Sequence, residues 1–122
     1  GCKSLSKIEI PSTVKTIESH AFKECSSLKE ISIPPSVESI GEHAFFNCSK
    51  LEKVVIQPNL ISIDNYAFFK CSSIEKISIP SSFKFIGENA FLYCISLKQI
   101  SLPSGVNSEV IGIGPDVKIN SF

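Results

Sequence analysis

The chain has 122 residues, of which 12 are basic and 12 acidic, so its formal net charge is zero. A zero net charge predicts no strong electrostatic attraction to nucleic acid or an anionic membrane surface, and the chain has no apolar run of the roughly 18 residues that a membrane span needs. The length fits one domain, and the 43% apolar content, with nine Phe and no Trp or Met, suits a packed interior. We therefore expect no nucleic-acid partner and no membrane insertion of this segment.

A repeat of 23 residues organises the sequence. The cysteines and the Ala-Phe pairs both recur at this interval, and a fixed period of about 20 to 50 residues is typical of stacked-repeat proteins. We call each repeat a coil: coil 1 covers residues 2–24, coil 2 covers 25–47, coil 3 covers 48–70, coil 4 covers 71–93, and coil 5 begins at residue 94. The two series are Cys2, Cys25, Cys48, Cys71, Cys94 and Ala21-Phe22, Ala44-Phe45, Ala67-Phe68, Ala90-Phe91.

A short strand is expected early in each coil. Two aliphatic residues separated by one position alternate with period two, which predicts a strand with one buried side. A proline follows and ends the strand, because it has no N–H and a fixed φ. In coil 3 this slot holds Gln57 and the proline moves to Pro58, which we expect to loosen that corner. The pairs are Ile8/Ile10, Ile31/Ile33, Val54/Ile56, Ile77/Ile79 and Ile100/Leu102.

Two further segments complete each coil. A V-x-x-I pattern, such as Val37 and Ile40, favours an extended or 3₁₀-like segment over a regular strand. The next pattern, Ala-Phe-x-x-Cys, places three side chains on one face of a single helical turn. We therefore predict an α/β repeat solenoid, a short right-handed coil with one parallel sheet and an irregular or briefly helical arc side. Equivalent residues, about 4.8 Å apart in successive coils, should form columns through the interior.

The repeat pattern fades near residue 106. Glu109 occupies the slot where an inward Ile is expected, and Val117-Lys118-Ile119 is a candidate last strand. Terminal repeats are usually atypical, so we interpret residues 1–106 as an array of about five units and residues 107–122 as an irregular C-terminal cap or tail. Residues 1–11 show no signal-peptide pattern, and Cys2 enters the repeat at its cysteine slot, so we expect a segment of a longer protein.

The cysteines are expected to be buried free thiols. Equal side-chain conformations in a column hold the sulfur atoms about 4.8 Å apart, against roughly 2.05 Å in a disulfide. A straight row of thiols cannot surround a tetrahedral metal ion, and no C-x-x-C motif occurs. Free cysteine packs as a small hydrophobe, so we predict that all five thiols become reactive only after denaturation.

Several arc residues admit a functional reading beside a structural one. His20 and His43 share one slot, continued by Tyr66 and Asn89, and two stacked imidazoles could hold a transition metal weakly; we expect surface residues instead. Phe46, Phe69 and Leu92 form a row beside the inward Phe column that is either an exposed apolar strip or packing between coils. Asn47-Cys48-Ser49 fits the glycosylation sequon, but its middle residue is expected to be buried.

The outward side of the predicted sheet is the candidate ligand surface, because repeat proteins often bind through such arrays. It contains no aromatic residue and no Arg, the residue types that dominate interface energies. We find no catalytic triad, phosphate loop or paired carboxylates, and so predict no enzyme, no cofactor and no metal. The ten outward residues are Lys7, Glu9, Glu30, Ser32, Lys53, Val55, Lys76, Ser78, Gln99 and Ser101.

The unit L-x-x-I-x-I-P-x-x-V-x-x-I-G-x-x-A-F-x-x-C closely resembles the BspA-like class of leucine-rich repeats (type 5), found in surface proteins of bacteria and protozoan parasites. The likeness covers residues 2 to about 106 and departs at Gln57 and after Ser108. It implies a leucine-rich-repeat solenoid that is often exported and in several cases associated with adhesion to host proteins or cells. It supplies no catalytic residue.

Pattern and resemblance together predict a non-catalytic protein-interaction module of a cell-surface or secreted protein, with adhesion or host contact as its role. The expected partner is a host or matrix protein, and the chain is expected to be a monomer or to associate end to end. The alternative is a structural spacer that holds other domains away from the surface and has no ligand of its own.

Overall fold

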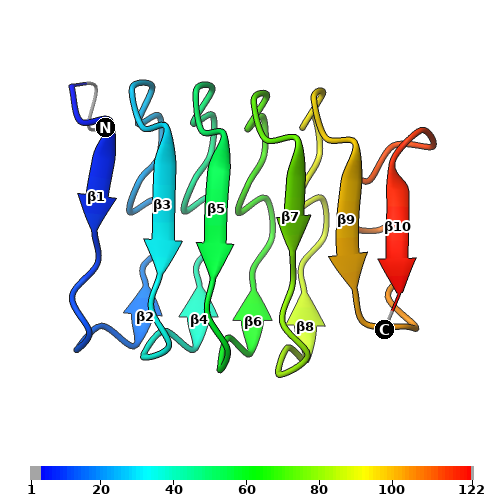
Figure 1. Ribbon diagram of the computed structural model, residues 1–122, viewed down its shortest axis with the longest axis horizontal. Coiled ribbons are helices and arrows are strands. Elements are labelled where there is room, and N and C mark those ends of the chain that lie inside the picture. The colour runs from blue at the N-terminus through cyan, green and yellow to red at the C-terminus, as the bar shows by residue number, and fades with distance from the viewer. Residues whose placement is uncertain (1–3, 122) are drawn as a thin grey trace.

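The computed structural model describes residues 4–121, which form a solenoid of coils stacked along one axis (Figure 1). Each coil contributes a strand to a front face, and coils 1 to 4 also contribute a shorter strand to a side face. All strand pairs are parallel. The front strands are β1 (Lys7–Glu9), β3 (Glu30–Ile33), β5 (Lys53–Ile56), β7 (Lys76–Ser78), β9 (Gln99–Leu102) and β10 (Lys118–Ser121). The side strands are β2 (Thr16–Ile17), β4 (Ser39–Ile40), β6 (Ser62–Ile63) and β8 (Phe85–Ile86).

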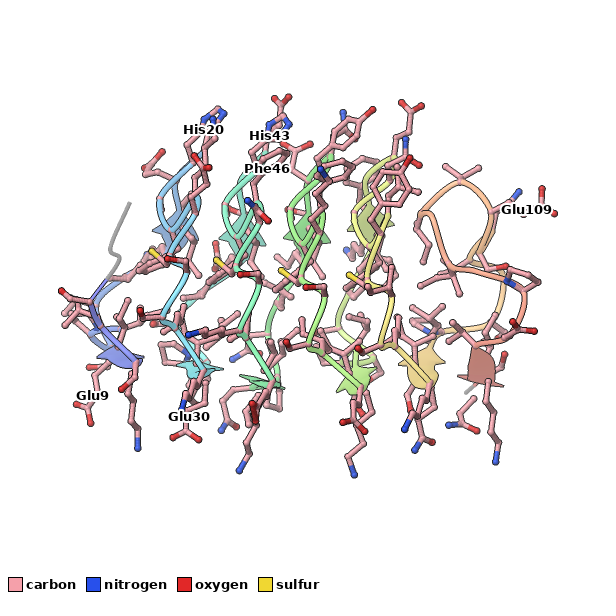
Figure 2. The ribbon with its side chains drawn as sticks, turned by 90° about the horizontal axis from the view of Figure 1, so that it is seen from above. Glu9, His20, Glu30, His43, Phe46 and Glu109 are labelled. Atoms are coloured by element: carbon pink, nitrogen blue, oxygen red, sulfur yellow. The ribbon has the colours of Figure 1, made fainter. Side chains whose placement is uncertain are left out.

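Equivalent residues of successive coils lie directly over one another, as the period predicts. The strand registers pair Ile8 with Ile31 and Ile31 with Val54. The sulfur atoms, yellow in Figure 2, lie in a row along the same axis. The inward Phe rings stack at centroid distances of 5.2, 5.0 and 5.4 Å through Phe22, Phe45, Phe68 and Phe91. The prediction of interior columns is confirmed.

Burial of the columns depends on position along the stack. Leu28 and Leu51, in coils 2 and 3, are fully buried, whereas the equivalent Leu5 in coil 1 is 51% exposed. Phe45 is fully buried and Phe22 is only half-buried. A coil therefore gains its dry interior from a neighbour on each side, which is the behaviour expected of a solenoid.

The arc segments are residues 18–25, 41–48, 64–71 and 87–94, and the helical turn predicted for them does not form. No helix occurs anywhere in residues 4–121. The residue before each Ala and the residue before each Cys have φ between 54 and 64°, the left-handed region, which no right-handed helix can contain. These residues are His20, His43, Tyr66, Asn89 and Glu24, Asn47, Lys70, Tyr93.

Backbone hydrogen bonds explain this arc conformation. In the first arc segment, residues 18–25, the N–H groups of Ala21, Lys23 and Cys25 donate within the segment, to carbonyls three residues earlier. The intervening N–H groups donate to coil 2, and the same alternation recurs in later coils. The left-handed residues turn every second N–H toward the neighbour, so the arc forms a ladder between coils. The coil 1 to coil 2 bonds are His20–Glu42 at 3.0 Å, Phe22–Ala44 at 2.7 Å and Glu24–Phe46 at 2.7 Å.

The side face corrects the prediction of one parallel sheet. The V-x-x-I segments are extended, but their last two residues pair between coils and make a four-stranded sheet β2-β4-β6-β8. Coils approach closely here: a Cβ on Gly41 would lie 2.6 Å from the Ser19 nitrogen, and one on Gly87 would lie 2.4 Å from the Asn65 nitrogen. Glycine is therefore required by close packing of backbones at these two positions.

The front face is divided into two sheets, β1-β3-β5 and β10-β9-β7. Strands β5 and β7 lie side by side in Figure 1 but are not hydrogen-bonded to each other. At the C-terminal end β10 pairs with β9, with Ile119 opposite Ile100, so a strand forms where the tail pattern indicated one. The division at residue 106 between array and cap stays a prediction.

Candidate functional site

All ten residues predicted for the ligand surface lie on the front face, and none of them is buried. The residues between them on the same strands, such as Ile31, Ile77 and Ile100, point inward and are buried. Figure 2 shows Glu9 and Glu30 on this side of the molecule, with His20, His43 and Phe46 on the opposite side. The predicted residues therefore form one continuous accessible array on a solid core.

Two adjoining hollows occupy the front face. The first, of about 390 Å³, lies over β1, β3 and β5 and is lined by six of the ten residues: Lys7, Glu9, Glu30, Ser32, Lys53 and Val55. The second, of about 880 Å³, lies over β5, β7 and β9 and is lined by Lys53 and Val55 again together with Lys76, Ser78, Gln99 and Ser101. The structure thus brings every predicted residue to at least one of two open depressions.

Charges on the front face are unevenly paired. Lys7 Nζ lies 3.1 Å from Glu30 Oε1, and Lys98 Nζ lies 3.6 Å from Glu75 Oε1. All four side chains are largely exposed, so each pair stabilises the fold by only about 0–1 kcal/mol. Lys53 and Lys76 have no carboxylate partner among residues 4–121.

The arc carries a second ordered surface made of rings. His20 stacks on His43 at a centroid distance of 5.1 Å and His43 stacks on Tyr66 at 5.2 Å, so the predicted row is confirmed. The Asn89 side chain donates to the Tyr66 hydroxyl at 3.4 Å. His43 Nδ1 lies 3.5 Å from a Glu42 carboxylate oxygen. Within residues 4–121 no three His, Cys, Asp or Glu side chains are grouped as metal ligands would be.

The row of Phe46, Phe69 and Leu92 is half-buried and packs between coils. The Phe46 and Phe69 rings stack at 4.9 Å, and Lys23 and Lys70 lie over their faces at 5.5 and 5.6 Å. These contacts cover much of the row, as expected for cation–π pairs at a surface.

An apolar patch that sequence reasoning missed lies where coil 4 passes into coil 5. Tyr93 is 56% exposed and Ile95 is 81% exposed. In the other coils the same slots hold polar residues, as Lys70 and Ser72 in coil 3 and coil 4 illustrate. The sequence did contain a signal for this patch, because the residues directly before and after Cys94 both depart from the repeat pattern.

Three of the five cysteines are free and buried, as predicted: Cys48, Cys71 and Cys94. Each thiol donates to the carbonyl of the Phe that lies 26 residues earlier, at 3.1 Å to Phe22, 3.2 Å to Phe45 and 3.2 Å to Phe68. Removal from water raises the pKa of Cys48 to about 11 and that of Cys94 to about 12, and it raises the pKa of Cys71 well above 9.0.

Cys25 is disulfide-bonded, so the prediction of five free thiols is wrong for this residue. The spacing argument assumed equal side-chain conformations along the whole column, and that assumption holds only where the thiol-to-carbonyl bonds repeat. Cys2 lies outside the described residues. Glycosylation of Asn47 stays a prediction: Asn47 is half-buried, its N–H donates to the Phe69 carbonyl at 2.7 Å, and Cys48 is buried.

Parallel front strands, a 23-residue coil and continuous aliphatic columns define a leucine-rich-repeat protein. The chain belongs to the BspA-type leucine-rich repeat family, whose repeat matches residues 1–111 in six copies. The match extends past residue 106, where the repeat pattern weakens in the sequence. Nothing in residues 4–121 is a helix that could cross a membrane.

Solved structures of bacterial leucine-rich-repeat proteins share this fold. A leucine-rich cell surface protein from Faecalibacterium prausnitzii A2-165 is 31% identical over 95% of the chain, with a TM-score of 0.83. A leucine-rich repeat protein from Bacteroides capillosus is 30% identical, with 80% of this chain and 76% of that chain covered and a TM-score of 0.71. The leucine-rich repeat protein of T. pallidum is 26% identical, with 96% and 72% covered and a TM-score of 0.64.

The chain spans 32% of the length of the F. prausnitzii protein. No curated protein sequence matches it.

Proposed function

We propose that the chain is a non-catalytic protein-interaction module of a cell-surface or secreted protein and that it binds its partner through the front face. The observation that carries this proposal is the accessible array of ten residues over two adjoining hollows. The array stands on strands whose inward residues, such as Ile31 and Ile100, are buried. A partner would therefore meet a surface whose geometry is fixed before binding, which lowers the entropy cost of association.

Adhesion to a host or matrix protein is the role we assign to this surface, and the cell exterior is its expected location. Support comes from the family: the F. prausnitzii relative, 31% identical, is described as a cell surface protein. Membership of the family supports the proposed location at the cell exterior more directly than it supports the proposed partner, because repeat proteins have a scaffold in common more often than a ligand.

The alternative is a spacer that holds other domains away from the surface. One observation favours it: the ten front-face residues include no Trp, Tyr, Phe or Arg. Interfaces usually depend on such residues, so binding by this face alone is expected to be weak.

Biolayer interferometry with the immobilised chain and purified host-surface and matrix proteins separates the two roles. A variant with Ser32→Arg and Ser78→Arg fills the front face, and a control with Ser12→Arg and Ser81→Arg adds the same charge at exposed corners. The module predicts a saturable partner that is lost in the front variant and kept in the control. Absence of any partner above background supports the spacer, and equal loss in both variants contradicts use of the front face.

A further inference from the structure

The gap between β5 and β7 is a local break in an otherwise regular face. The carbonyl of Glu52 accepts no hydrogen bond from residues 4–121, and the N–H of Glu75, which should reach it, donates to none. The equivalent carbonyls at the other four contacts each accept at least one bond from the next coil, the shortest at 2.7–2.9 Å: Ser6 from Lys29, Lys29 from Glu52, Glu75 from Lys98, and Lys98 from Lys118. A backbone donor and a backbone acceptor of two residues that line the hollow of about 880 Å³ are thus without a backbone partner among residues 4–121.

The charge pattern accounts for the break. Where coil 2 meets coil 3, equivalent positions of the two coils carry opposite charges: Lys29 lies beside Glu52, and Glu30 lies beside Lys53. Where coil 3 meets coil 4, both slots set like against like, Glu52 with Glu75 and Lys53 with Lys76. Like charges directly opposite on neighbouring strands are destabilising. The front contact that fails to pair is therefore the one at which both rows repel.

The break is confined to the front face. Coils 3 and 4 remain joined along the side face, along the arc and at the corner before β7. These bonds fix the distance between coils 3 and 4, so β5 and β7 cannot move together on the front face without breaking them. The bonds are Lys84 N–H to the Ile61 carbonyl at 2.7 Å, Tyr66 N–H to the Glu88 carbonyl at 3.1 Å, and Ser73 Oγ to the Ser49 carbonyl at 2.6 Å.

This part of the front face is positively charged although the chain is neutral. From β5 onward, the strands and the residue before each strand carry four lysines against two glutamates: Lys53, Lys76, Lys98 and Lys118 against Glu52 and Glu75. Lys98 neutralises Glu75. Lys53 and Lys76 stand unpaired on opposite sides of the break.

We propose that the break between β5 and β7 is a binding site for the carboxylates of an acidic segment of a protein partner. Lys53 and Lys76 flank the carboxylate, and the open N–H of Glu75 donates a hydrogen bond to it. Charge-assisted bonds of this kind are the stronger class of hydrogen bond. The inference rests on the proposed function, because it names the part of the front face that a partner engages and the chemistry that the partner brings.

A labelled oligoglutamate peptide, followed by fluorescence anisotropy at low salt, is the direct probe. Wild type is compared with K53Q/K76Q and with the matched control K15Q/K84Q, which removes the same charge from exposed lysines beside the side-face strands. We expect K53Q/K76Q to weaken binding about fivefold or more, since each exposed ion pair contributes modestly. The control should stay within about twofold. Equal weakening in both variants, or no binding to wild type, overturns the site.

Two further experiments are needed. The first asks whether the bound carboxylate belongs to a protein or to a polysaccharide, and the second asks whether this site can fail while the proposed function holds. Hyaluronate offers carboxylates on a polysaccharide; tighter binding of hyaluronate than of the peptide overturns the assignment to a protein segment. A protein partner found in the interferometry experiment should lose affinity for K53Q/K76Q. If it binds wild type and K53Q/K76Q equally but fails on the Ser32→Arg/Ser78→Arg variant, the proposed function stands and this site falls.

Discussion

The arc and the front face are made by the same coils, yet only the arc is continuous from end to end. Along the arc, identical or similar side chains stack in every coil, as the Phe rings do at 5.0–5.4 Å. Along the front face the outward slots change from coil to coil, and the ladder fails where they repel. Apolar columns therefore carry the stability of this fold, whereas the polar rows are free to vary and so can carry specificity.

The largest effect should follow from breaking a column at its middle. Phe45→Ala removes a fully buried ring stacked on two others and should lower the free energy of unfolding by about 3–5 kcal/mol. Phe22→Ala should cost less, because Phe22 is half-buried and, among residues 4–121, its ring stacks on one other Phe ring, that of Phe45. Thermal or urea denaturation measures both, and equal losses would contradict the column as the source of stability.

Crowding the side face should have the next largest effect. Gly87→Ala places a Cβ 2.4 Å from the Asn65 nitrogen, and overpacking of this kind costs about 1–3 kcal/mol. Gly114→Ala is the matched control, since a Cβ there meets nothing within 4 Å. A Gly87→Ala protein as stable as the control would show that the coils can separate on this side without cost.

Alkaline pH should weaken the interior columns. Thiols in the unfolded chain ionise near pH 9.0, whereas burial raises the pKa of Cys48 to about 11. Between these pH values the folded state holds more protons than the unfolded state, so stability falls as pH rises. Cys48→Ala should therefore make the melting temperature less dependent on pH over this interval. An unchanged slope would show that this thiol does not contribute.

The smallest effect should come from repairing the front face. The variant E75K/K76E/K98E restores opposite charges where coil 3 meets coil 4 and keeps them where coil 4 meets coil 5. We expect a gain of about 0.2–1 kcal/mol, the range for opposite charges on neighbouring strands. Hydrogen exchange at the residue 75 amide is the sharper readout: new protection is expected if β5 and β7 join, and continued fast exchange would mean that charge does not cause the break.

The columns were predictable because one residue type recurs at one interval. Cys48 and Cys71 could be placed over one another from the period alone, as could Phe45 and Phe68, and the outward front residues followed from strand alternation. The sequence also contains the signal for the break between β5 and β7, namely the like charges of Glu52 and Glu75. That signal is found by comparing equivalent positions in neighbouring coils, not by examining consecutive residues.

The arc and the side face were not predictable from local patterns. Ala-Phe-x-x-Cys has helical spacing, but the left-handed backbone at His20 and Glu24 is stabilised by bonds to the next coil, which no window within one coil contains. The two-residue strand at Thr16–Ile17 likewise exists only because an equivalent segment lies beside it. The disulfide of Cys25 departs from the repeat and so leaves no periodic signal.

The arc ladder has an electrostatic consequence for the ends of the molecule. The left-handed residues and the Phe of each arc, as in the Phe22 N–H to Ala44 carbonyl bond, direct the N–H of the earlier coil at the later one, so these peptide dipoles add along the axis. The last arc N–H groups, of Asn89 and Phe91, point toward the C-terminal turn. That end of the arc ladder therefore carries a partial positive charge. The dipole of this ladder grows with each coil that is stacked onto it, whereas bonds at the corners and on the side face, such as Lys29 N–H to the Ser6 carbonyl and Gly41 N–H to the Ile17 carbonyl, point the opposite way.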